Sequence, residues 1–178
     1  MIKMKKDNKQ NKEKPKLKSK IVKHKMLNKK APLFSLSCPD AIPTKLSSFQ
    51  GEYVVLYFYP KDNTPGCTIE AQDFTKLKSK FSKNDTIIIG ISTDSCDCHS
   101  KFIKNKKLDI LLLSDDKKEV HKKYNVWGKK QFMGKSYMGT LRTTFLIDPD
   151  GYVIKVWENV NPKGHAQEVL NYLENMVV

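Results

Sequence analysis

The stretch that decides the fold runs from residue 53 to residue 67 and reads Tyr53-Val54-Val55-Leu56-Tyr57-Phe58-Tyr59-Pro60-Lys61-Asp62-Asn63-Thr64-Pro65-Gly66-Cys67. Its first half is apolar on both faces of an extended chain, which is typical of a central strand. Its second half is a polar turn that delivers one cysteine to the start of a helical pattern. A thiol at a helix N-terminus faces unpaired N–H groups and the positive end of the helix dipole, and both favour the reactive thiolate. Cys67 is therefore a candidate catalytic thiol, the alternative being a small buried side chain after a loop.

Helical and extended patterns alternate on both sides of this stretch. Phe74, Leu77 and Phe81 recur at helical spacing after Cys67, and a β-branched strand follows at 86–92. The other expected elements are a strand at 31–36, a loop at 44–51, a helix capped by Asp94 or Ser95 with Cys96, His99 and Ile103 on one face, a strand at 110–113, a helix at 117–124, a loop at 128–139, a hairpin at 143–157 and a last helix from Gly164. This order predicts an α/β thioredoxin-like fold, with a central mixed β-sheet flanked by helices.

The charge of the chain is concentrated at its start. Residues 1–30 hold thirteen lysines against Asp7 and Glu13, a net charge of +11 out of +14 for the whole chain. We expect a basic arm over 1–30, disordered because it has too little apolar surface to offset the entropy of ordering, followed by one globular domain over 31–178. Since no run is apolar enough for a signal peptide or a membrane span, we expect no membrane association and an intracellular protein.

The arm itself allows two interpretations. A lysine-rich segment is typical of nuclear localisation or of nucleic-acid binding, which would place the protein in the nucleus or let it bind nucleic acid through residues 1–30. The alternative is a solvated tail of a cytoplasmic protein whose composition favours lysine and asparagine. Both interpretations stay open at the level of the sequence.

The four cysteines are Cys38, Cys67, Cys96 and Cys98. Because no secretory segment is visible, we expect a reducing compartment, in which reactive thiols are commoner than structural disulfides. Cys38 precedes a proline in a loop and is interpreted as structural or incidental.

A metal site is the less favoured interpretation of residues 96–99. Cys96-Asp97-Cys98-His99 crowds its ligand types on one helical turn, and no second cluster is available to complete a tetrahedral set. His121 has no acidic or cysteine neighbour that suggests a ligand and is expected to be solvated, while His165 is expected at the start of a helix.

Arg142 is the only arginine among 33 basic residues. Its guanidinium is a planar, permanently charged fork of donors that lysine cannot replace, so we expect a functional role rather than a surface ion pair. A thiolate at Cys67 is suited to attack on a peroxide O–O bond, for which Arg142 can supply the cation and Thr64 a hydroxyl in the same turn. Pro60 and Pro65 can stiffen the loop and shield the thiol. The product would be a sulfenic acid that a second thiol must reduce.

The loop Pro60-Lys61-Asp62-Asn63-Thr64-Pro65-Gly66-Cys67-Thr68 resembles the active-site loop of the peroxiredoxins, Pro-x-x-x-Thr-x-x-Cys. The similarity is greatest to the bacterioferritin-comigratory-protein or peroxiredoxin Q branch and extends from about Ala31 to the C-terminus. It includes Gly90-Ile91-Ser92-Thr93-Asp94-Ser95 with His99, Trp127-Gly128, Arg142-Thr143-Thr144-Phe145-Leu146-Ile147-Asp148 and Gly164-His165.

This resemblance implies that Cys67 is the peroxidatic cysteine and that Thr64, Pro60 and Arg142 complete the site. Glu70, at the family's Cys-Thr-x-Glu position, would support the loop and the arginine. The family also implies reduction of hydrogen peroxide and organic hydroperoxides without metal, haem or flavin, at the expense of thioredoxin, glutaredoxin or glutathione. Members of this branch are often monomers.

The chain departs from the resemblance at the resolving cysteine. Many members carry it five residues after the peroxidatic one, where this chain has Gln72, and others carry it near what is Ile103 here. Cys96 and Cys98 lie on the helix that holds Ile103, so either is a candidate resolving cysteine. We favour reduction by an external thiol, with an internal disulfide through Cys96 or Cys98 as the alternative.

Two other classes of function remain open. The protein could be associated with nucleic acid or chromatin, with the lysine arm as its binding element and the peroxidase site secondary. It could also be a peroxide sensor that passes oxidation from Cys67 to a partner.

Overall fold

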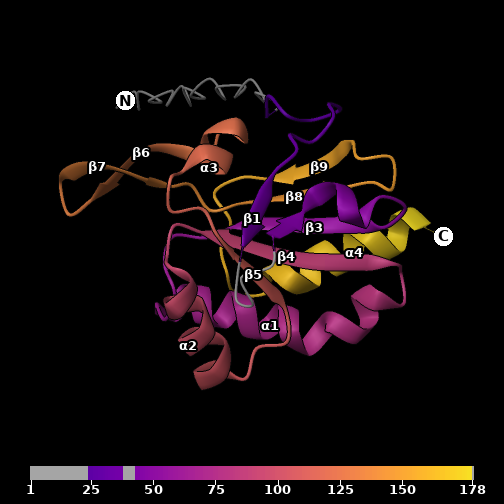
Figure 1. The fold of residues 1–178 in the computed structure, drawn as a ribbon, viewed down its shortest axis with the longest axis horizontal. Helices are drawn as coiled ribbons and strands as arrows, with labels where there is room; N and C mark the ends of the chain where they lie inside the picture. The colour runs from indigo at the N-terminus through magenta and orange to yellow at the C-terminus, as the bar shows by residue number, and fades with distance from the viewer. Residues whose placement is uncertain (1–23, 38–42, 178) are drawn as a thin grey trace, which may run out of the picture.

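The computed structural model describes residues 24–37 and 43–177. A five-stranded sheet forms the centre of the molecule (Figure 1), in the order β5-β4-β3-β8-β9. Strand β3 runs parallel to β4 and antiparallel to β8. The strands of this sheet are β3 (Tyr53–Phe58), β4 (Thr86–Ser92), β5 (Leu111–Ser114), β8 (Thr143–Ile147) and β9 (Val153–Trp157). The predicted thioredoxin-like fold, with a mixed sheet flanked by helices, is confirmed.

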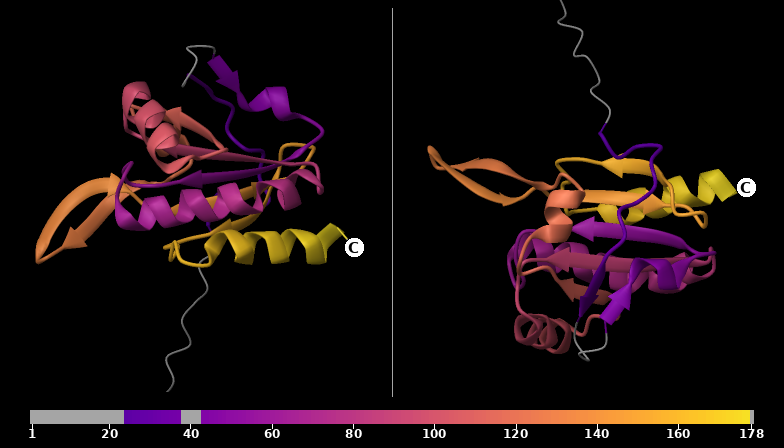
Figure 2. Two further views of the ribbon diagram at one scale, coloured as in Figure 1. Left: turned by 90° about the horizontal axis from the view of Figure 1, so that it is seen from below. Right: turned by 45° about the horizontal axis from the view of Figure 1, so that its top comes forward.

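Strand β3 lies in the middle of the sheet and is buried on both faces. Its alternating side chains enter two separate cores, because successive residues of a strand point to opposite faces. Val55 and Tyr57 join the core under α1 (Pro65–Ser82) and α4 (His165–Val177), which lie side by side on one face (Figure 2). Val54, Leu56 and Phe58 join the core on the other face, under the N-terminal segment and α3 (Glu119–Lys123).

The helices begin within two residues of where the sequence predicts. In α1, Phe74 and Phe81 are fully buried at the expected spacing. Helix α2 (Cys96–Lys106) is capped by Ser95, whose hydroxyl accepts a hydrogen bond from the N–H of Cys98 at 3.4 Å. Helix α4 begins at His165, as expected.

The predicted loop at 128–139 is wrong. The segment forms an antiparallel hairpin of β6 (Trp127–Phe132) and β7 (Lys135–Thr140), which projects from the body of the molecule in both figures. Its two turn residues, Met133 and Gly134, both have positive φ, at 48° and 77°. Such turns are usually recognised in a sequence by Asn-Gly or Asp-Gly, and here methionine occupies the first position, so the sequence did not indicate the hairpin.

The segment before β3 is also more regular than expected. The strand predicted at 31–36 is shorter, as β1 (Ser35–Ser37), and it pairs with β2 (Pro43–Lys45). The loop predicted at 44–51 holds most of β2 and a 3₁₀ turn, η1 (Leu46–Phe49).

Part of the segment assigned to the basic arm lies against the domain. Asn28 donates its N–H to the carbonyl of Val153 at 2.8 Å, Lys30 pairs with Tyr152, and Met26 is buried. Residues 24–30 therefore pack beside β9, and the rest of the arm lies outside the described residues. Within the part of the chain that the structure describes, no helix is both long and apolar enough to span a membrane.

Gly90 offers a test of the core that supports β3. It pairs with Tyr57 across β3 and β4, and a Cβ there would lie 2.6 Å from Tyr57 Cζ and 2.7 Å from Leu112 Cδ2. We expect Gly90→Ala to lower the free energy of unfolding by about 2 kcal/mol, because a buried ring has no room to move. Urea unfolding followed by circular dichroism measures the change.

Gly139→Ala is the matched control. A Cβ at Gly139 would meet side-chain carbons of Lys130 and Tyr137 at 3.2 Å, and both side chains can adjust at the surface of the hairpin. Equal stability of the Gly90→Ala variant and the native protein would contradict the packing described for Tyr57.

Candidate active site

Cys67 lies in the first turn of α1, directly beyond the end of β3. Pro65 opens the helix and Thr64 precedes it in an extended conformation, which is the arrangement favoured at a helix start. The carbonyl of Thr64 accepts the N–H of Thr68 at 2.9 Å. The thiol is a free cysteine and only 1% exposed. The loop therefore delivers a buried, unbridged sulfur to the N-terminus of a long helix.

The pairing of β3 with β8 brings Arg142 to this sulfur. Phe58 pairs with Thr143, so the residue before β8 lies beside the end of β3. Arg142 donates from Nη2 to Cys67 Sγ at 3.1 Å. The backbone carbonyl of Arg142 accepts the N–H of Val160 at 3.1 Å, which fixes the backbone from which the guanidinium extends. A permanent cation that donates to sulfur stabilises negative charge there.

Glu70 holds the other side of the guanidinium. Arg142 Nη1 donates to Glu70 Oε2, and the glutamate side chain is fully buried, one helical turn after Cys67. Burial raises the pKa of Glu70 to about 7, although Arg142 opposes the shift. Burial by itself would lower the pKa of Arg142, but Glu70 and then Cys67 raise it. The arginine thus stays charged between two acidic groups.

The walls of the site are tightly packed. A Cβ at Gly66 would lie 3.1 Å from Pro162 Cγ and 3.5 Å from Arg142 Nη2, so little room for a side chain exists there. In the core cluster that contains Cys67, the Tyr57 ring stacks on Phe74 with a centroid distance of 4.9 Å. Burial, followed by Glu70 and Cys67, holds the pKa of Tyr57 well above its usual value, and the phenol remains neutral.

Thr64 and Pro60 lie in the loop before Cys67, as the sequence places them. The Thr64 hydroxyl donates to the carbonyl of Lys61 at 3.1 Å and makes no described hydrogen bond to Cys67 or Arg142. Pro60 follows β3 and is half-buried. The structure therefore brings Cys67, Arg142 and Glu70 into direct contact and leaves Thr64 and Pro60 as parts of the surrounding loop.

The two candidate resolving cysteines differ in state. Cys98 is a free, exposed thiol, whereas Cys96 is disulfide-bonded. Because Cys67 and Cys98 are both free, neither is the partner of Cys96. Cys38 lies outside the described residues.

Three neighbours of the site were not singled out as functional from the sequence. Asp62, in the loop, forms a buried pair with His99 of α2. The pKa of Lys130 is lowered by burial and then by Arg142, with Cys67 opposing, so this second cation lies within electrostatic reach of the sulfur. One lysine among so many carries no signal in the sequence.

The prediction that His121 is solvated is wrong. Its side chain is fully buried, and Nδ1 lies 2.6 Å from Asp115 Oδ2. Nor do residues 96–99 assemble as a ligand set, since Cys96 is in a disulfide and His99 Nδ1 lies 2.7 Å from Asp62 Oδ2. No group of three or more histidine, cysteine or acidic side chains suited to a metal occurs among residues 24–37 and 43–177.

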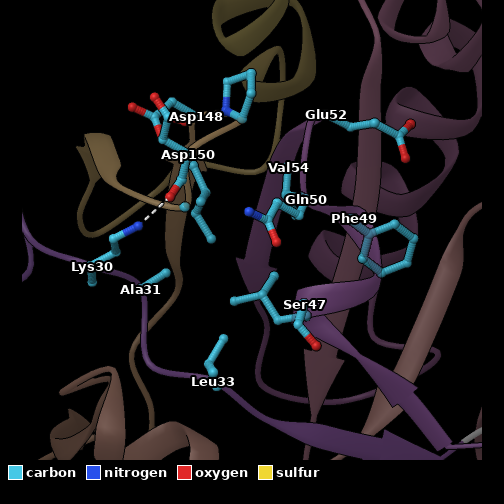
Figure 3. Close-up of a pocket in the computed structure, with 14 residues that line it drawn as sticks. Lys30, Ala31, Leu33, Ser47, Phe49, Gln50, Glu52, Val54, Asp148 and Asp150 are labelled. Carbon is cyan, nitrogen blue, oxygen red and sulfur yellow. Dashed lines mark hydrogen bonds between the residues drawn. The ribbon is translucent and has the colours of Figure 1, made fainter.

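A separate cavity of about 360 Å³ opens at the far end of the sheet. Figure 3 shows its lining, with Val54 at the start of β3 facing the turn that carries Asp148 and Asp150. The lining contains no cysteine or arginine, and Val54 lies at the opposite end of β3 from the loop that carries Cys67. This cavity therefore takes no part in the cysteine site.

Comparison with known proteins identifies the chain. The model of the AhpC/TSA family matches residues 27–156. A peroxiredoxin Bcp of Bacillus subtilis is 45% identical over 150 residues, covering 84% of this chain and 96% of the relative. The chain is a peroxiredoxin of the AhpC/TSA family.

Other peroxiredoxins of the same branch agree. The peroxiredoxin Bcp of Escherichia coli K12 is 41% identical over 144 residues, covering 81% of this chain and 92% of the relative. A solved peroxiredoxin Q from Xanthomonas campestris superposes with a TM-score of 0.76 at 37% identity, covering 80% of this chain and 91% of that one. The predicted resemblance to the Bcp or peroxiredoxin Q branch is confirmed. As a peroxiredoxin, the protein is a thiol-dependent peroxidase and an oxidoreductase.

These relatives give no support to the alternative interpretations of the arm. Those named here come from bacteria, so they do not favour a nuclear location. A role with nucleic acid or chromatin as the main function is likewise not favoured.

The buried glutamate of this peroxiredoxin predicts a pH-dependent stability. Because the pKa of Glu70 is raised from 4.5 to about 7 in the folded state, the folded protein keeps a proton that the unfolded chain has lost at intermediate pH. The free energy of unfolding should fall by on the order of 3 kcal/mol as pH rises from 4.5 to about 7. Above about pH 7, Glu70 should cause no further fall.

Urea titrations across the window compare the native protein with Glu70→Gln, which cannot titrate at this position. The difference in unfolding free energy between the two proteins should follow the titration of Glu70. A difference that stays constant from about pH 4.5 to about pH 8 would contradict a raised pKa.

Proposed function

We propose that Cys67 is the peroxidatic cysteine and that Arg142 and Glu70 form the catalytic site with it. The observation that carries the proposal is the hydrogen bond from Arg142 Nη2 to Cys67 Sγ at 3.1 Å. It joins the cysteine in the first turn of α1 to the one arginine of the chain. A thiolate held by a permanent cation is the nucleophile that reduction of a peroxide requires.

The chemical step follows from this contact. The thiolate of Cys67 attacks one peroxide oxygen, an S–O bond forms and the O–O bond breaks. The leaving oxygen departs as hydroxide or alkoxide and takes a proton to become water or an alcohol. Arg142 is placed to stabilise the charge as it moves from sulfur to oxygen. Two electrons pass from sulfur to peroxide, and Cys67 becomes a sulfenic acid.

Thr64 would orient the peroxide. Its hydroxyl uses its single hydrogen to donate to the carbonyl of Lys61, so the lone pairs of the oxygen remain to accept a hydrogen bond. A peroxide O–H could donate to Thr64 while its oxygens accept from Arg142. Pro60 would limit the entry of water beside them. This arrangement suits hydrogen peroxide and organic hydroperoxides alike.

Reduction of the sulfenic acid is assigned to an external thiol such as thioredoxin, glutaredoxin or glutathione. A thiol attacks Cys67 sulfur and releases water, and a second thiol then frees Cys67 by forming a disulfide with the first. Cys96 is disulfide-bonded in this structure and would need reduction before it could act. Cys98 is the free candidate for an internal cycle, although its side chain faces solvent. The enzyme would act as a monomer.

Substitution of the two central residues tests the site. Cys67→Ser should abolish consumption of hydrogen peroxide. Arg142→Lys should lower the second-order rate constant by about tenfold or more, because an ammonium has a single nitrogen and cannot occupy the positions of both Nη1 and Nη2. Stopped-flow assays with purified full-length protein measure both. Circular dichroism verifies that each variant is folded. Activity that survives in Cys67→Ser would refute the assignment.

Intact-mass spectrometry tests how the cycle is completed. The fully reduced protein is mixed with one equivalent of hydrogen peroxide and trapped with dimedone. The external-thiol route predicts one added oxygen before trapping and, after it, a dimedone adduct on the peptide that carries Cys67, with the oxygen released as water. Loss of two hydrogens, with a peptide that links Cys67 to Cys96 or Cys98, would establish the internal disulfide instead.

A further inference from the structure

A buried histidine–carboxylate pair joins the loop before Cys67 to helix α2. His99 Nδ1 lies 2.7 Å from Asp62 Oδ2, and the two side chains are 0% and 3% exposed. The Tyr59 hydroxyl donates to the second carboxylate oxygen, Oδ1, at 2.7 Å. Both oxygens of Asp62 are therefore satisfied inside the protein, one by Tyr59 directly after β3 and one by His99 of α2.

The backbone of Asp62 is held as well. Its N–H donates to Asp94 Oδ2 at 2.9 Å. Asp94 is fixed in turn, since Ser92 Oγ donates to the same carboxylate oxygen at 2.8 Å and Ser114 Oγ donates to the Asp94 carbonyl at 2.6 Å. The ends of β4 and β5 thus form a rigid support against which Asp62 is fastened.

The loop depends on Asp62 because its other residues contribute few contacts. Among the described hydrogen bonds of residues 60–64, those that reach other elements pass through Asp62, apart from the helical bond from Thr68 to Thr64. Thr64 bonds only within the loop, to Lys61. Asn63 lies in the left-handed region, with φ at 59°. Because one residue of the loop is strained and its external hydrogen bonds pass through Asp62, the position of the loop depends on those bonds.

We propose that Asp62 and His99 are positioning residues that keep the loop closed and hold Cys67 in register with Arg142. Neither residue has a described hydrogen bond to the sulfur. When their hydrogen bond is broken, the loop opens, the thiol becomes accessible and loses its alignment with the guanidinium. The inference builds on the proposed function, because the alignment it concerns is the one that peroxide reduction uses.

Of the two ring nitrogens of His99, only Nδ1 binds Asp62. Nδ1 donates to the carboxylate, while Nε2 is buried and has no hydrogen-bond partner among the described residues. An asparagine places its amide nitrogen close to the position of Nδ1 and carries nothing at the position of Nε2. His99→Asn therefore keeps the bond to Asp62, and His99→Leu removes it at similar volume.

The chain supplies its own control. His121 and Asp115 form a second pair of the same kind, with Nδ1 2.6 Å from Oδ2 and both side chains buried. Its Nε2 is likewise without a described partner. Asp115 accepts the N–H groups of Glu119 and His121 at the start of α3, and no described hydrogen bond joins Asp115 or His121 to residues 60–67. His121→Leu thus imposes the same chemical loss without removing a described hydrogen bond of residues 60–67.

The experiment measures two rates in full-length reduced protein. One is oxidation of Cys67 by hydrogen peroxide in a single turnover. The other is alkylation of Cys67 by N-ethylmaleimide, resolved by peptide mass spectrometry because Cys98 is also free and reduction opens the disulfide of Cys96. In His99→Leu we expect peroxide oxidation to fall about tenfold and alkylation to rise about tenfold, the factor that corresponds to one buried hydrogen bond. His99→Asn and His121→Leu should leave both rates within about threefold of the native protein.

Each outcome decides the proposal. Opposite changes in the two rates of His99→Leu, restored in His99→Asn, support it. Rates in His99→Leu that match those in His121→Leu overturn it, and so does a His99→Asn variant that behaves like His99→Leu. If His99→Leu does not fold, Asp62→Leu takes its place with the same expected changes, because leucine has no oxygen to accept from His99. A native protein that consumes no peroxide refutes the proposed function alone, because alkylation still reports loop opening.

Discussion

The contact between the Arg142 guanidinium and the Cys67 sulfur is the interaction on which the rest of the site depends. The two residues are far apart in the sequence, and the sheet brings them together. Strand β3 ends at Phe58 and the following loop returns the chain to the start of α1. Because Phe58 pairs with Thr143, Arg142 enters beside that same end. A shift of the β3–β8 register by one residue would move the arginine to the opposite face of the sheet.

This geometry has an energetic cost that is concentrated at Glu70. The carboxylate is fully buried, and its Oε1 has no described hydrogen-bond partner. Burying a charge is offset only when its partner is well placed, and the attraction of Arg142 does not fully compensate, since the pKa of Glu70 is raised. In return, Glu70 holds the Nη1 nitrogen of the guanidinium while the Nη2 nitrogen faces the sulfur. Lysine has only one nitrogen at its end and cannot serve both partners from separate positions, which explains an arginine at this position of a lysine-rich chain.

The sequence predicted the parts of this structure that follow from local pattern. Apolar runs identified β3 and β4, and the spacing of Phe74 and Phe81 identified α1. The candidate residues Cys67 and Arg142 came from a helix start and from a unique residue type. The β6–β7 hairpin escaped prediction because its Met133-Gly134 turn takes positive φ without asparagine or aspartate. Contacts made by tertiary packing, such as the cation of Lys130 near the site, leave no local signal.

Histidine illustrates why burial is the hardest property to predict from sequence. His121 follows Asp115 by six residues, and only the turn into α3 reveals that the two side chains meet in the core. His99 and Asp62 are separated by a strand and a helix, and the order of β3 and β4 in the sheet makes them neighbours. The two pairs share one chemistry, a buried imidazole that donates to a carboxylate, yet one caps a helix and the other fastens the loop that carries Cys67. Their roles are therefore set by the element to which each carboxylate belongs, and this is information that the fold supplies.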